Sequence, residues 1–146
     1  MNFKVKIGLA ALVAFGSVVA CGGSPASPNG TQTKAGAVTR LITQSLPDVE
    51  GKEGMVEIVD FAPGEASQVH RHNCDLFVYV LSGTVETQLK GGRLQTVHTG
   101  GTFSESPTDI HVVSRNASAS EPAKLAVFYV KAKGTPPTEI LPDGAK

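Results

Sequence analysis

The sequence has no tryptophan and is poor in aromatic residues, in cysteine and in charge of either sign. It has two cysteines, two tyrosines and six phenylalanines in 146 residues, and its 13 basic residues equal its 13 acidic ones. Two cysteines cannot supply the disulfide framework of a small secreted scaffold. The balanced charge excludes the strongly basic surface of a nucleic-acid-binding domain. The chain must therefore be stabilised by a hydrophobic core, alone or together with a metal ion.

The first twenty residues have the composition of an export signal. Lys4 and Lys6 supply positive charge, and the apolar stretch 7–20 is shorter than a typical membrane span. The stretch S-V-V-A-C then leads directly into Cys21 and resembles a bacterial lipobox. The resemblance implies a lipoprotein signal peptide over 1–20 and acylation of Cys21, for example with palmitate. The protein would then be anchored to a membrane of the cell envelope, facing the periplasm or the exterior. The alternatives are an ordinary secretory signal and an uncleaved anchor helix.

Two low-complexity segments flank the part of the chain that can fold. Residues 21–37, which begin at the lipidated cysteine, are rich in Gly, Ser, Pro and Thr and have the composition of a flexible linker. Residues 135–146 form a Pro-rich C-terminal tail. The segment 38–134 lies between them, and its length suits one hydrophobic core. If Cys21 carries lipid, Cys74 has no partner for an intramolecular disulfide.

The segment 38–134 has the pattern of an all-β fold. Short stretches rich in Val, Ile, Thr, Tyr or Phe alternate with turn residues, and no stretch has ten residues of helical periodicity. Strands about 8 to 12 residues apart are typical of a sandwich or a barrel. The stretches 76–81 and 124–130 are apolar on both faces, so we expect both at the centre of a sheet. The predicted strands are 40–44, 55–61, 68–72, 76–81, 84–89, 94–98, 110–114 and 123–131.

The residues best suited to metal chemistry are the four histidines, His70, His72, His98 and His111. His70 and His72 stand two apart on one predicted strand, so their side chains should lie on the same face, about 7 Å apart along the backbone. Imidazole nitrogens at that spacing can converge on one ion. An isolated H-x-H is a weak signal, because two solvated or carbonyl-bonded histidines at a strand edge give the same pattern. His98 fits no motif, and we expect it to be exposed.

The spacing around the first two histidines resembles the first motif of the cupin family, G-x5-H-x-H-x3,4-E-x6-G. Gly64, His70, His72 and Gly83 all stand where the motif requires them. One position departs, because Leu76 stands where the family has its glutamate ligand.

The second cupin motif, G-x5-P-x-G-x2-H-x3-N, is matched more loosely. Gly100 and His111 fit the motif, whereas Ser106 and Thr108 replace its proline and its second glycine. The asparagine arrives one residue late, as Asn116.

The resemblance covers roughly 55–133 and implies a double-stranded β-helix, the small jelly-roll barrel of the cupins. It further implies a divalent metal at the mouth of the barrel, held by His70, His72 and His111. Zinc, iron, manganese, nickel and copper all bind imidazole and remain alternatives. The loss of the glutamate at Leu76 leaves open both a three-His centre and a site without metal.

Two further side chains near Leu76 could bear on the site. Cys74 shares the parity of His70 and His72, so its thiolate is a candidate ligand; a buried or surface thiol without metal is the alternative. Asp75 should point to the opposite face of the strand.

Glu105 precedes the turn of the second motif and is the candidate catalytic residue. A carboxylate there is commonly a solvated turn residue, but pointing inward it could act as a general base toward a water held by the ion.

Three kinds of function fit the sequence: a metal-dependent enzyme acting on a small molecule, a module that binds a metal or small ligand, and a metal-free ligand-binding or interaction domain. We expect a small-molecule partner, membrane contact through the lipid only, no nucleic acid, and pairing of two copies through a sheet edge as one option for assembly.

Overall fold

The computed structural model describes residues 36–142 and 144. The expected signal peptide, Cys21 and most of the linker lie outside these residues. The described part contains no helix of the length and apolar character that crossing a membrane requires. Its strands are β1 (Ala37–Ser45), β2 (Lys52–Phe61), β3 (His70–Arg71), β4 (Asp75–Ser82), β5 (Thr84–Leu89), β6 (Gln95–His98), β7 (Thr102–Glu105), β8 (Ile110–Asn116), β9 (Ala123–Ala132) and β10 (Glu139–Ile140).

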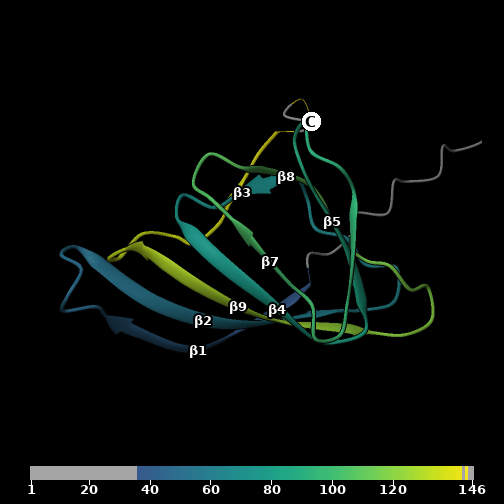
Figure 1. Cartoon of the computed structure of the whole chain (residues 1–146), viewed down its shortest axis with the longest axis horizontal. Coiled ribbons are helices and arrows are strands. Elements are labelled where there is room, and N and C mark those ends of the chain that lie inside the picture. The colour runs from purple at the N-terminus through teal and green to yellow at the C-terminus, as the bar shows by residue number, and fades with distance from the viewer. Residues whose placement is uncertain (1–35, 143, 145–146) are drawn as a thin grey trace, which may run out of the picture. The chain divides into compact units, whose positions relative to one another are not determined.

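The strands form two antiparallel five-stranded sheets, as the expected double-stranded β-helix requires. One sheet has the order β1-β2-β9-β4-β7 and the other the order β10-β3-β8-β5-β6. Figure 1 shows β1, β2, β9 and β4 side by side in the first sheet, with β3, β8 and β5 across from them in the second. The chain changes sheet after β2, β3, β4, β6, β7, β8 and β9, so residues distant in sequence meet between the sheets.

The central strand β4 shows how the core is built. Along D-L-F-V-Y-V-L-S, burial alternates, so that Leu76, Val78 and Val80 point inward while Phe77 and Tyr79 are exposed. The prediction that β4 and β9 lie inside a sheet is confirmed. The outward-facing apolar side chains of β4 remain exposed, because no layer packs on its outer face in the described residues. Burial of a side chain such as that of Val80 contributes about 1.5–3 kcal/mol to stability.

A glycine ends the first histidine-containing motif for a steric reason. Gly83 joins β4 of one sheet to β5 of the other and has a φ of 76°. A Cβ at this position would lie 2.6 Å from the carbonyl oxygen of Pro122 and 2.8 Å from the Cα of Ala123. Both the positive φ and the close approach require glycine, so the turn brings β4 and β5 to the correct places around the core.

Two strands were missed by the sequence pattern. β7 reads T-F-S-E and β10 only E-I, and neither has the run of apolar residues that predicts a strand. Each forms because it completes the edge of a sheet: β7 pairs with β4, and β10 pairs with β3. Both lie next to the histidines, so they matter for the site.

Candidate metal centre

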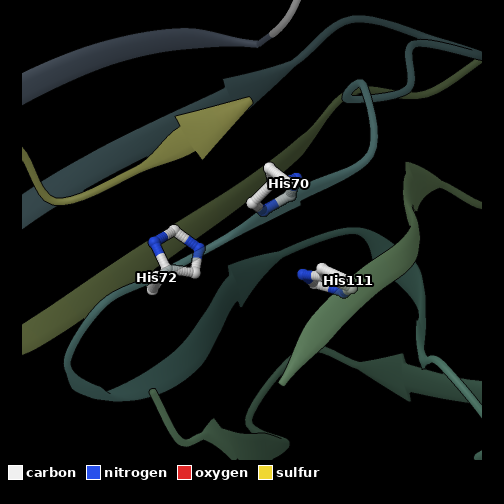
Figure 2. A group of neighbouring side chains, drawn as sticks. All are labelled: His70, His72 and His111. Carbon is white, nitrogen blue, oxygen red and sulfur yellow. The ribbon is translucent and has the colours of Figure 1, made fainter. Parts of the chain in front are cut away.

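Three of the four histidines converge between the sheets. His70 lies on β3 and pairs in register with His111 on β8, while His72 directly follows β3. The centroids of the His70 ring and each of the other two rings are 4.9 Å apart. One nitrogen from each ring lies within 4.8 Å of the other two, and all three residues are buried. Figure 2 shows the three rings pointing toward one common space.

Each imidazole is held by a hydrogen bond on the nitrogen that faces away from this space. Nδ1 of His70 donates to the carbonyl oxygen of Gln68 at 2.7 Å, and Nδ1 of His72 donates to that of Pro137 at 2.9 Å. A carbonyl can only accept, so both Nδ1 atoms carry the proton and both Nε2 atoms offer a lone pair. His111 is held through Nε2, which lies 2.6 Å from Oγ1 of Thr87. Such outer partners fix ring orientation and tautomer in metal sites.

Burial keeps the imidazoles of His70 and His72 uncharged. It lowers the pKa of His70 to about 4, and the hydrogen bond to Gln68 offsets only part of this effect. Burial also lowers the pKa of His72. Desolvation disfavours the charged form of a base, so these two rings are neutral at pH 7. The neutral imidazole is the form that binds a metal ion.

Glu105 lies in the same cluster. It is the last residue of β7 and pairs with Leu76 of β4, and its side chain is 3% exposed. Its Oε1 is 3.1 Å from Nδ1 of His111, and its Oε2 is 3.9 Å from Nε2 of His72. Burial opposes ionisation of this carboxyl, but the interactions with His111 and the other imidazoles outweigh burial and hold its pKa below the ordinary value. Glu105 is therefore an inward-facing carboxylate and not a solvated turn residue.

Two atoms of this cluster lack partners within the described part of the chain. Oε2 of Glu105 and Nδ1 of His111 are buried without a hydrogen bond. Buried polar atoms are rarely left so, because each unsatisfied group costs about 1–3 kcal/mol. Three imidazole nitrogens and a carboxylate oxygen directed at one space are a ligand set that fits a divalent ion such as Zn²⁺, Fe²⁺, Mn²⁺ or Ni²⁺.

The histidines form one end of a cavity of about 270 Å³. Apolar side chains of the sheet β1-β2-β9-β4-β7 make most of its wall, and β10 of the other sheet adds one. The apolar lining residues are Val38, Val59, Phe61, Leu76, Val78, Phe103, Leu125, Val127 and Ile140. A concave apolar pocket with a few convergent polar groups is the usual form of a small-molecule site.

A second polar group faces the cavity near His72. The Tyr129 ring lies 5.7 Å from the His72 ring, and the cavity wall also includes Glu57. Nε and Nη2 of Arg40 both donate to Oε1 of Glu57 at 3.1 Å, which neutralises this buried carboxylate. Burial and the adjacent Glu57 raise the pKa of Tyr129, so its hydroxyl keeps its proton.

Other residues singled out from the sequence lie elsewhere. Cys74 packs in the hydrophobic core, and burial raises the pKa of its thiol, which disfavours the thiolate form that binds metals. Asp75 is exposed, as strand parity predicted. His98 is exposed and lies 3.1 Å from Oγ1 of Thr84 through its Nδ1.

Sequence reasoning missed the side chains and carbonyls that support the ligands. Thr87 is an unremarkable position in a strand, and Pro137 and Thr138 lie in the segment expected to be a tail. Only the alternation of β5 gives a signal, since Thr87 shares the inward parity of Val85.

The two-sheet fold and the facing histidines define the class of the protein, a double-stranded β-helix domain with a three-histidine cluster. The family model described as "Cupin domain" matches residues 57–129, half of the chain. The protein therefore belongs to the cupin family. No curated protein matches the chain.

Solved structures with the same fold share little sequence with it. A cupin-like protein from Thermotoga maritima is 22% identical, with a TM-score of 0.58 over 71% of this chain and 74% of the other. A Klebsiella pneumoniae protein with a double-stranded β-helix domain is 18% identical, with a TM-score of 0.56 over 81% and 90%. The DMSP lyase DddQ from Ruegeria pomeroyi is 17% identical, with a TM-score of 0.59 over 73% of this chain but only 51% of the lyase. At these identities the similarity shows the fold alone.

Proposed function

We propose that this protein is an envelope-tethered cupin that holds a divalent metal ion on His70, His72 and His111 and binds or acts on a small molecule at that ion. The observation that carries the proposal is the convergence of three buried imidazole nitrogens in one cavity, each ring held by a partner on its far side. Bound there, the ion would supply a positive charge that polarises an oxygen of the ligand. The chain's own residues would orient the ion and exclude water.

The cavity indicates the kind of small molecule. A cavity of about 150 Å³ accepts one benzene ring, so about 270 Å³ suits a molecule of roughly ten to twelve non-hydrogen atoms. Its wall is mainly apolar, and its polar side chains are the histidines with Glu105, the pair Glu57 and Tyr129, and Ser67, Gln68, Ser114 and Thr138. The ligand we expect is therefore mainly apolar, with one oxygen-bearing head group that meets the metal. The same cavity also supports the alternative, a metal-free ligand-binding module, because its apolar wall does not depend on an ion.

The first experiment is elemental analysis of the protein purified without chelator and without a histidine tag. It is compared with the variant His70→Ala/His72→Ala/His111→Ala, whose fold is checked by circular dichroism. Near-stoichiometric metal in the wild type and none in the folded variant supports the proposal and identifies the ion. An equal, trace content in both proteins contradicts the metal-dependent function. Binding of apolar carboxylates or phenols to both proteins would then favour the metal-free module.

The tether rests on the sequence alone, on the charged and apolar N-terminus that ends at Cys21. We expect the wild type in the membrane fraction of a bacterial host and Cys21→Ser in the soluble envelope fraction or unprocessed. Release of the wild type without membrane association would contradict the lipid anchor and leave the metal site unaffected.

A further inference from the structure

We propose that Glu105 is a fourth ligand of the metal centre and supplies, from β7, the carboxylate that Leu76 cannot supply from β4. The inference rests on the proposed function, because it assigns a further ligand to the same ion. It concerns a residue that neither histidine-containing stretch of the sequence places at the metal.

The register of the sheet brings the two positions together. Leu76 and Glu105 are direct partners across the antiparallel pair of β4 and β7, and both line the histidine cavity. Opposite residues of an antiparallel pair have Cβ atoms about 4.5–5.5 Å apart on the same face. A glutamate side chain spans such a distance, so its carboxylate can reach one ion from either strand. The apolar Leu76 then packs in the core, where it is 1% exposed.

One of the two distances around Glu105 matches that of ligands that share an ion, and the other is slightly longer. Two donor atoms each bound at about 2.0–2.2 Å, at tetrahedral to octahedral angles, lie about 3–3.5 Å apart. Oε1 of Glu105 is 3.1 Å from Nδ1 of His111, and Oε2 is 3.9 Å from Nε2 of His72. Small shifts of the carboxylate would therefore complete the coordination.

The lack of hydrogen-bond partners for Glu105 also supports its role as a ligand. Its Oε2 and Nδ1 of His111 have no hydrogen bond in the described part of the chain. The basic side chains within 4.0 Å of its carboxylate there are the imidazoles of His72 and His111, with no lysine or arginine among them. A buried carboxylate needs a cation or several donors. Glu57 shows the contrast, because it lies in the same cavity wall and is neutralised by Arg40.

The test is a Co²⁺ titration of the metal-free protein with four sequences: wild type, Glu105→Gln, Glu86→Gln and the exchange variant Leu76→Glu/Glu105→Leu. Loss of a residue behind a ligand costs roughly 10–100-fold in affinity. We expect Glu105→Gln to weaken Co²⁺ binding by at least about 100-fold, beyond that range. The control Glu86→Gln should bind as the wild type does, because Glu86 of β5 pairs with Arg115 and does not line the cavity. The exchange variant should recover most of the loss, because the carboxylate returns to the same face of the cavity.

The outcomes separate this inference from the proposed function. A wild type that binds no Co²⁺ overturns both. Wild-type binding with unchanged affinity in Glu105→Gln overturns only the role of Glu105. A folded exchange variant without recovery shows that the carboxylate orients His111 and does not bind the ion, which also overturns it.

A crystal structure of the Co²⁺-loaded wild type decides the question if the exchange variant does not fold. The ion is located by its anomalous scattering. A Glu105 oxygen about 2.0–2.2 Å from the ion supports the inference. A carboxylate beyond coordination distance overturns it and leaves Glu105 in the role of a general base beside the ion.

Discussion

At the scale of single residues, the metal centre depends on the partners behind its ligands. Thr87 is the only side-chain group among these partners that is fully buried with its histidine: its Oγ1 lies 2.6 Å from Nε2 of His111, and Thr87 is 4% exposed. The other two rings are held mainly by backbone carbonyls, which mutation cannot remove. Thr87 is therefore the position at which a small substitution can disturb the orientation of a ligand without removing the ligand.

We predict that Thr87→Val, which preserves shape and removes the hydroxyl, weakens metal binding by about 10–100-fold. The reason is that the His111 ring loses the contact that fixes its orientation and tautomer. Competition of the protein with a chromophoric chelator for Zn²⁺ measures the affinity. Thr84→Val is the matched control, because Thr84 makes the same type of contact with His98 at the exposed end of the same strand. Equal affinity in Thr87→Val and Thr84→Val would show that this contact does not support the site.

The sequence predicts the histidines well and Glu105 poorly, for a physical reason. His70 and His72 share a face because strand geometry has a period of two, and this is readable from two positions in one strand. Whether Glu105 points inward depends on the register of β7 against β4, which is set by the turn and packing of both strands and not by either alone. Parity did predict the exposed side chain of Asp75. The sequence did not show that the Glu105 side chain of β7 reaches the histidine cluster beside the neighbouring strand β4.

At the scale of elements, the short strand β10 and the residues just before it support the site. It pairs with β3, so that Ile140 lies opposite His70, and Arg71 binds Glu139 through Nε at 2.9 Å and Nη2 at 3.2 Å. The carbonyl of Pro137, just before β10, receives the hydrogen bond from His72. Sequence pattern gave no sign of this strand, because two residues among prolines carry no periodicity. Its order comes from pairing with β3.

We predict that ending the chain after Pro136 weakens metal binding by about 10–100-fold, because His72 loses its outer hydrogen bond. This truncation keeps Thr135, whose carbonyl accepts a hydrogen bond from the buried Lys131. The fold should therefore survive, as far-UV circular dichroism and a thermal melt can establish. Ending the chain after Leu141 is the matched control, since it retains β10 and the Pro137 carbonyl. Wild-type affinity in the shorter chain would contradict the role of β10 and of the residues just before it.

At the scale of the whole molecule, the buried histidines connect the site to stability. The core lies between the two sheets, and the cluster occupies one end of it without a lysine or arginine partner in the described residues. A folded protein that must hold imidazoles neutral gives up stability when acid would protonate them. Keeping these histidines buried and neutral therefore lowers the free energy of unfolding in acid. A bound ion offsets this loss because it stabilises the native state alone.

The metal-free protein should lose stability in mild acid. The pKa of His70 falls from about 6.5 in the unfolded chain to about 4 in the folded one, because of burial. Between these two values the unfolded state binds the proton and the folded state does not, so the free energy of unfolding falls as pH falls. From His70 alone the loss is about 2 kcal/mol at pH 5 and approaches about 3 kcal/mol only below pH 4, against the roughly 5–15 kcal/mol typical of a domain. The pKa of His72 shifts in the same direction.

Urea unfolding of the chelator-treated protein at pH 7.0, 6.0 and 5.0 measures how the free energy of unfolding depends on pH. His70→Gln should flatten this dependence, whereas the exposed His98→Gln should not. Stability that is constant from pH 7 to 5 in the wild type would contradict the buried, neutral state of His70 on which metal binding depends.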